Sequence, residues 1–139
     1  MTEGFVADAS VGIAWAVESQ ASPDTRDLLD QVGAGVPFIV PVLWPFEVTN
    51  ALLILVRRGR MTPEDFSRVR ADFWIAKPVI DAEGPRFAWD ETVHLAEKFG
   101  LTVYDASYLE LAMRTRLALA SRDASLNRAA RLCGVQTLL

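Results

Sequence analysis

The segment Phe5-Val6-Ala7-Asp8 joins a short apolar run directly to a carboxylate. The same arrangement returns near the other end of the chain, where the run 117–122 leads to Asp123. Both runs have the length and apolar character of a buried strand. In open α/β sheets, ligands bind outside the carboxyl ends of the strands. We therefore expect Asp8 and Asp123 to lie at a functional edge of a sheet.

Between these two segments, short apolar runs alternate with longer segments of helical character, and prolines or glycines bound many of them. We expect strands at 4–7, 37–41, 78–80 and 117–121, with a possible short fifth strand at 135–138. We expect helices at 10–18, 23–32, 43–58, 63–75, 85–99, 102–116 and 124–133. The alternation predicts a single α/β domain over residues 1–139, with three α/β/α layers and a mostly parallel sheet of four or five strands.

The composition fits one domain with its own core. A chain of 139 residues is long enough to remove roughly 68–70% of its unfolded surface from water. Apolar residues make up 51% of the chain, which is rich for a soluble protein, and such an excess often ends in a subunit interface. We therefore expect a homodimer. The formal net charge of −4 gives no global basic field, so local patches must decide any nucleic-acid binding.

Several other classes of site are disfavoured. The single cysteine, Cys133, excludes an internal disulfide and a cysteine-rich zinc site, and it fits a reducing cytoplasm. No signal peptide is expected, and the apolar stretch 36–56 contains three prolines and Glu47, so it is not a membrane span. His94 is the only histidine, and no nucleophile-elbow sequence or phosphate-binding glycine loop accompanies it.

Four acidic residues remain as candidate functional groups: Asp8, Glu47, Asp105 and Asp123. Three of them have a structural alternative. Asp8 and Asp123 could each cap the helix that follows, and Asp105 stands three residues after Thr102, in the spacing of a capping box. Carboxylates gathered at one place repel one another unless a divalent cation holds them. Their positions therefore favour a metal-dependent site.

Glu47 is the acid with the weakest structural alternative. Its helix is apolar almost all round, which predicts burial in a core or an interface. A buried carboxylate is costly without a partner. Asn50 lies three residues later on the same face and can hydrogen-bond beside it. We therefore expect Glu47 to be functional and Asn50 to orient it.

Four segments of the chain now resemble a known family. They are Val6-Ala7-Asp8-Ala9-Ser10, Glu47-Val48-Thr49-Asn50-Ala51-Leu52, Leu101-Thr102-Val103-Tyr104-Asp105-Ala106-Ser107-Tyr108-Leu109-Glu110-Leu111-Ala112 and Ala120-Ser121-Arg122-Asp123-Ala124-Ser125-Leu126. In order and spacing the chain resembles the PIN-domain ribonucleases, and within them the VapC-type toxins of toxin–antitoxin pairs. The Tyr-Asp-Ala-Ser-Tyr block is specific, whereas Asp-x-Ser alone is weak. Ser121 stands where many relatives carry Thr, a change that keeps the hydroxyl.

The resemblance implies a Mg²⁺-dependent endoribonuclease, with Mn²⁺ as a possible substitute, inhibited by a small VapB-like antitoxin. Asp8, Asp105 and Asp123 would hold the metal, directly or through water, and Glu47 would complete the cluster. Water activated by the metal would attack the phosphodiester bond of RNA. Supporting roles are expected for Ser10, Asn50 and Ser121. The basic residues that could contact RNA phosphates are Arg57, Arg58, Arg60 and Arg122.

Alternatives remain open at this point. Ser10 could cap a helix, and the arginines could be solvated helix ends or bind the antitoxin. The chain could also be a catalytically silent PIN-like module that acts by binding proteins. A receiver-like Asp/Mg²⁺ domain is disfavoured, because it would need a lysine near the late strand and the only lysines are Lys77 and Lys98.

Overall fold

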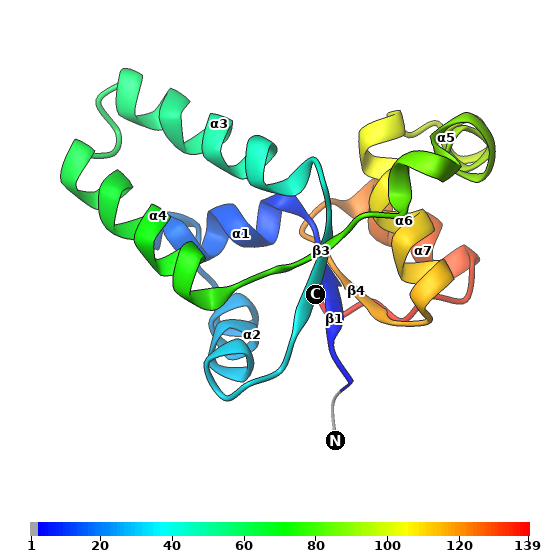
Figure 1. Cartoon of the computed structure of the whole chain (residues 1–139), viewed down its shortest axis with the longest axis horizontal. Helices are drawn as coiled ribbons and strands as arrows, with labels where there is room; N and C mark the ends of the chain where they lie inside the picture. The colour runs from blue at the N-terminus through cyan, green and yellow to red at the C-terminus, as the bar shows by residue number, and fades with distance from the viewer. Residues whose placement is uncertain (1–2) are drawn as a thin grey trace.

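Four short parallel strands form the central sheet in the computed structural model, which describes residues 3–139 (Figure 1). They are β1 (Phe5–Ala7), β2 (Phe38–Pro41), β3 (Val79–Asp81) and β4 (Ala118–Ala120). The strand order is β3-β2-β1-β4, and every neighbouring pair is parallel. All four carboxyl ends therefore lie at one edge of the sheet. The expected fifth strand is only an isolated bridge between Thr137 and Leu119.

Helices cover both faces of the sheet, as the three-layer prediction requires (Figure 1). One face carries α1 (Ala9–Ala16), α2 (Pro23–Gly33), α3 (Trp44–Arg57) and α4 (Pro63–Ala76). The other carries α5 (Val93–Phe99), α6 (Val103–Thr115) and α7 (Ala124–Leu132), with α6 packed against β1, β2 and β4. A short 3₁₀ helix, η1 (Glu18–Gln20), follows α1. The predicted fold class is confirmed.

The segment expected as one helix over 85–99 is divided into three parts. A 3₁₀ turn, η2 (Gly84–Phe87), leads into a wide π-type turn, η3 (Ala88–Thr92), before α5 begins. Pro85 lacks an N–H and suits the tight first turn. The segment buries Thr92 at 2% exposure and leaves Trp89 91% exposed. The predicted helical segment that stops at Gly100 is confirmed, but the type of helix changes twice along it.

The core lies between the helix layers and is centred on β1. Phe5, Val6 and Ala7 are fully buried, because helices cover both faces of a parallel sheet. Edge-to-face aromatic contacts join Phe38 to Trp15 and to Trp44, linking β2 with α1 and α3. Across residues 3–139, no helix has the length and hydropathy needed to span a bilayer.

The helix that carries Glu47 is not buried all round. A single stripe of α3 is buried, formed by Trp44, Val48 and Leu52, whereas Phe46 is 77% exposed. Its buried stripe packs on α1, and its other faces are only partly covered by α4. The core of this chain therefore buries only one stripe of the helix, and the alternative expectation, burial in an interface, stays a prediction.

Candidate active site

Asp8 is the most deeply buried of the four predicted acids. It follows β1, is 5% exposed, and caps α1 by accepting a hydrogen bond from the Val11 backbone (3.3 Å to Oδ1). Two serine hydroxyls also donate to its carboxylate, Ser10 to Oδ1 at 2.5 Å and Ser121 to Oδ2. Burial raises the pKa of Asp8, while the two serine bonds lower it. Helix capping and a place in the site coincide in one carboxylate.

The two serines connect Asp8 to the loop that follows β4. The Ser10 hydroxyl oxygen accepts a hydrogen bond from the Arg122 backbone at 2.9 Å, and the Ser121 oxygen accepts one from the Asp123 backbone at 3.0 Å. Each serine hydroxyl therefore accepts a hydrogen bond from a backbone N–H and donates its own hydrogen to Asp8. Segments far apart in the sequence are thereby held as one unit at the carboxyl edge. Ser10 and Ser121 thus hold the Asp8 carboxylate in place, while their supporting roles in a functional site stay predictions.

Glu47 lies in the first turn of α3 and is half-buried. The Tyr108 hydroxyl donates to its Oε1 at 2.6 Å. Burial raises the pKa of Glu47, the bond from Tyr108 lowers it, and the nearby charges of Asp105 and Asp8 raise it. Asn50 is exposed, and no hydrogen bond within residues 3–139 joins it to Glu47. The orienting partner is therefore Tyr108, and not Asn50 as expected from the sequence.

Asp105 and Asp123 both occupy the beginnings of helices. The Asp105 backbone donates to the Thr102 hydroxyl at 3.0 Å at the start of α6, which confirms that Thr102 caps this helix. Asp123 caps α7 by accepting a hydrogen bond from the Leu126 backbone at 2.7 Å. Burial raises the pKa of the half-buried Asp105, and the charge of Asp123 raises it further. Asp123 itself is exposed.

The four carboxylates converge without forming a closed ligand cage. The charge of Asp105 raises the pKa of both Asp8 and Glu47, so these groups share one electrostatic environment. Yet no three His, Cys, Asp or Glu side chains in the described part of the chain are arranged to hold one ion together. Mg²⁺ usually keeps several waters and takes one or two carboxylates directly. An all-oxygen set of mutually repelling acids fits such an ion, held partly through water.

No protein-family model and no curated protein matches the chain. The structure is similar to that of PAE2754 from Pyrobaculum aerophilum, with a TM-score of 0.71 and 25% identity, covering 97% of this chain and 83% of that one. It is also similar to FitAcB from Neisseria gonorrhoeae, with a TM-score of 0.63 and 13% identity, covering 97% and 96% of the two chains. Both are PIN-domain proteins.

The chain has a PIN-like fold. The carboxyl edge of its PIN-like sheet also holds an acid that the sequence prediction missed. Asp81 ends β3 and accepts two hydrogen bonds from Arg114, at 3.0 Å to Oδ1 and 2.6 Å to Oδ2. Arg114 also donates to the buried Glu110 at 2.7 Å. These bonds hold the pKa of Asp81 below its ordinary value. Asp81 is thus neutralised by an arginine, in contrast to the four predicted acids. Its position directly after the expected strand 78–80 was the available signal.

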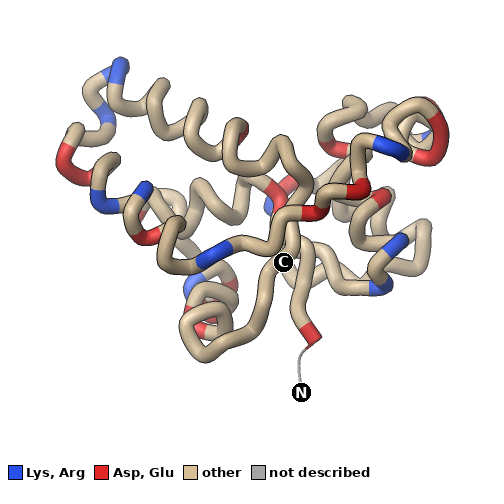
Figure 2. The backbone as a smooth tube through the Cα atoms, viewed as in Figure 1, with Lys and Arg blue, Asp and Glu red and all other residues tan. Residues whose placement is uncertain are grey.

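The predicted RNA-binding arginines occupy two separate regions of the PIN-like fold. Figure 2 shows basic positions at the turn between α3 and α4, where Arg57, Arg58 and Arg60 lie. Glu47 is at the opposite end of α3, ten residues from Arg57 and therefore about 15 Å away along the helix axis. Arg122 is different, because its backbone is bonded to Ser10 and its side chain is exposed beside the site. Only Arg122 of this group adjoins the acids.

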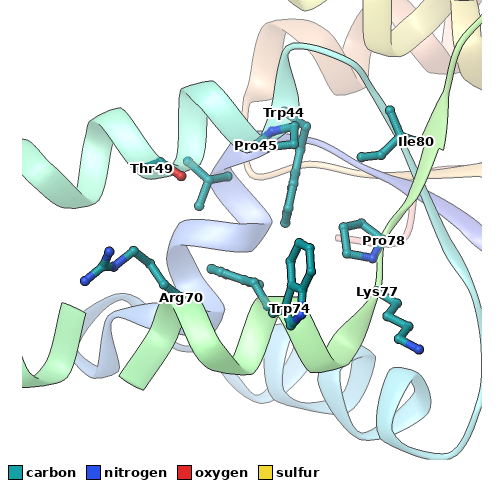
Figure 3. A pocket seen from close by; sticks show the side chains of 10 residues that line it. Trp44, Pro45, Thr49, Arg70, Trp74, Lys77, Pro78 and Ile80 are labelled. Carbon is teal, nitrogen blue, oxygen red and sulfur yellow. The ribbon is translucent and has the colours of Figure 1, made fainter. Parts of the chain in front are cut away.

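A separate apolar hollow lies between α3, α4 and β3, with a volume of about 690 Å³ (Figure 3). Trp44 and Trp74 line it from the two helices, and Pro78 and Ile80 line it from the strand side. Trp74 is 84% exposed. Trp44 also borders the acid site, because its indole Nε1 donates to the backbone oxygen of Asp8 at 3.0 Å. One buried ring is therefore shared between the hollow and the site.

Proposed function

We propose that this chain is a Mg²⁺-dependent endoribonuclease, the toxin component of a VapBC-type toxin–antitoxin pair. The observation that carries the proposal is the convergence of Asp8, Glu47, Asp105 and Asp123 at the carboxyl edge of a PIN-like sheet. Three of these carboxyls have a raised pKa, and buried acids that repel one another are typical of sites that take a cation or do chemistry.

Each acid has a role under this proposal. Asp8, Asp105 and Asp123 hold the ion, directly or through water, and Glu47 completes the negative site. Ser10 and Ser121 fix the carboxylate of Asp8, so that it does not have to be ordered when the ion arrives. The ion, when bound, supplies an activated water for in-line attack on phosphorus and offsets charge on the phosphate. Mn²⁺ would serve in the same way.

The substrate contacts assigned to this site are to phosphate. The exposed Arg122 lies next to Asp123, so its guanidinium can reach a phosphate held at the acids. The arginines of the α3–α4 turn (Arg57, Arg58 and Arg60) are too far along α3 to touch the same phosphate. Under the proposal these three arginines contact phosphates further along the RNA strand. Because such contacts are electrostatic, the affinity for RNA should fall as the salt concentration rises.

The protein partners proposed are a second copy of the chain and a small VapB-like antitoxin. The apolar hollow beside Trp74 supports binding of a protein partner of either kind, since large exposed apolar patches mark interaction surfaces. A basic side chain of the antitoxin placed near the acids would compete with the ion. The same surface also supports the alternative proposal, a catalytically silent PIN-like module that acts through protein binding. A reducing cytoplasm remains the expected location.

The deciding experiment measures Mg²⁺-dependent cleavage of RNA by purified wild type, Asp8→Asn and Asp105→Asn. Asp72→Asn serves as the matched control, because Asp72 is an exposed acid on α4 away from the carboxyl edge. We expect both site variants to lose at least about a hundredfold in rate, since each removes a metal ligand, and the control to keep full activity. Equal activity in all four proteins, or cleavage in excess chelator, would refute the nuclease proposal and leave the binding module.

A further inference from the structure

Tyr108 is one of the most deeply buried polar side chains of the structure. It lies on α6, is 1% exposed, and its ring is part of the hydrophobic core. Its hydroxyl donates to Glu47 Oε1 at 2.6 Å, across 61 positions of sequence. A buried tyrosine hydroxyl normally finds a partner, and a backbone carbonyl would be enough for that purpose. Here the partner is a carboxylate of the candidate active site.

The hydrogen bond from Tyr108 is what holds the Glu47 carboxylate in place. Asp8 is held by three donors and Asp123 by the backbone of Leu126. For Glu47, the Tyr108 hydroxyl is the one side-chain or backbone donor to its carboxylate within residues 3–139. Oε2 of Glu47 accepts no hydrogen bond from the described residues, so one carboxylate oxygen is anchored and the other is available to a ligand.

We propose that Tyr108 is a positioning residue for the metal site, which holds Glu47 Oε1 so that Oε2 faces the divalent ion. The inference rests on the proposed function, because it assigns Glu47 to the ion. Its physical basis is rigidity: a long glutamate side chain would otherwise sample several rotamers, and the buried ring of Tyr108 cannot move with it.

The test measures Mn²⁺ binding to the purified protein by calorimetry, without RNA. Tyr108→Phe removes the hydroxyl and keeps the ring. Tyr104→Phe is the matched control, because Tyr104 lies one turn earlier on α6 and is 66% exposed. We expect Tyr108→Phe to weaken Mn²⁺ binding about tenfold, as losing a partner of a metal ligand typically does, and Tyr104→Phe to leave it unchanged.

A double-mutant comparison separates positioning from a general effect on structure. In a Glu47→Ala background the Tyr108 hydroxyl has nothing to position, so adding Tyr108→Phe should not weaken Mn²⁺ binding further. Glu47→Asp keeps the charge but shortens the side chain, so it withdraws the carboxylate from the Tyr108 hydroxyl and from the ion together. It should weaken binding as Tyr108→Phe does, and it covers the case in which Tyr108→Phe does not fold.

The outcomes distinguish this inference from the proposed function. Wild type that binds Mn²⁺ while Tyr108→Phe or Glu47→Asp binds it equally well overturns the positioning role alone. The same holds if Tyr108→Phe weakens binding as much in the Glu47→Ala background as in wild type. Wild type that fails to bind Mn²⁺ overturns the metal proposal, and the positioning role with it.

Discussion

At the scale of single residues, Ser121 makes the connection on which the site depends. Its hydroxyl donates to Asp8 and accepts from the Asp123 backbone at 3.0 Å, and it is fully buried. Its backbone oxygen accepts a further hydrogen bond from the side-chain amide Nδ2 of Asn127 at 2.9 Å. One side chain therefore orients a buried carboxylate and fixes the loop that carries another.

Replacing Ser121 by alanine tests this connection. Ser121→Ala leaves Asp8 Oδ2 buried without its donor, which raises the pKa of Asp8 further. Since an ionised carboxylate is needed to hold a cation, we expect RNA cleavage to fall about 10- to 100-fold and the acid limb of the pH–rate profile to move to higher pH. Ser121→Thr keeps the hydroxyl and should retain activity. An alanine variant with wild-type rate would contradict this role.

Asp105 allows a prediction about stability. Burial and Asp123 raise its folded pKa above the ordinary value of 3.8. The native state therefore binds a proton more readily than the unfolded chain, and stability falls as pH rises through that interval. At pH 7, without metal, we expect Asp105→Asn to melt a few degrees above wild type.

This gain in melting temperature should vanish when the pH falls below 3.8, the ordinary pKa of the carboxyl, because Asp105 is then protonated in both the folded and the unfolded state. Excess Mg²⁺ should raise the melting temperature of wild type and not of the variant, because the ion binds the folded form. Scanning fluorimetry across pH measures both effects, with Asp72→Asn as the control. A lower melting temperature for Asp105→Asn at pH 7 would count against the electrostatic reading of the site.

At the scale of elements, the approach of α1 to α3 places Trp44 under the site. Gly12 makes this approach possible: a Cβ at that position would lie 2.6 Å from Trp44 Cζ2 and 3.0 Å from Val48 Cγ2. Both neighbours are 2% exposed and belong to the core, so neither can move freely. The fit of two helices thus positions the ring that binds the Asp8 backbone.

We expect Gly12→Ala to cost about 1–3 kcal/mol of folding free energy, because it overpacks the core. Chemical denaturation measures the free energy of unfolding of wild type, of Gly12→Ala and of a control variant. Gly33→Ala is the matched control, since an added Cβ there meets nothing within 4 Å at the end of α2. That variant should be neutral or slightly stabilising. Equal effects at the two glycines would mean that the Trp44 contact does not limit the packing.

The elements also show how far sequence alone could reach. The strands were predictable because each is a short apolar run, and three of them are bounded by proline or an acid, as at Pro37–Pro41 and Ala7-Asp8. The partner of Glu47 was not, because Asn50 is its neighbour in the helix, whereas Tyr108 reaches it only when α6 packs against the sheet. Local periodicity describes one element at a time, and the site is made by contacts between elements.

At the scale of the whole molecule, the apolar surface is distributed unevenly. Trp74 on α4 is 84% exposed, and it lines the apolar hollow together with Ile80 of β3, which is 43% exposed. Trp89 is 91% exposed but lies on the far side of the sheet, in η3. If the chain forms a homodimer, the surface around Trp74 is the better candidate for its interface.

Sedimentation velocity of two single variants tests this assignment. We expect Trp74→Ser to weaken dimerisation at least about tenfold, because a tryptophan at the centre of an interface often contributes about 2 kcal/mol or more. Trp89→Ser, an equally exposed tryptophan outside the patch, should dimerise like wild type. The reverse result would move the interface to η3, and a monomeric wild type would remove the homodimer from the proposal.

The order of the strands has a consequence for synthesis in the cell. β1 is made first but sits between β2 and β4, and its register with β4 pairs Phe5 with Ala118. A chain leaving the ribosome therefore holds β1, one of the two inner strands, half-paired until almost all residues have been translated. Pairings this distant in sequence close late and slowly. Asp8 cannot meet Ser121 before then, so a nascent chain that lacks β4 carries no assembled acid site.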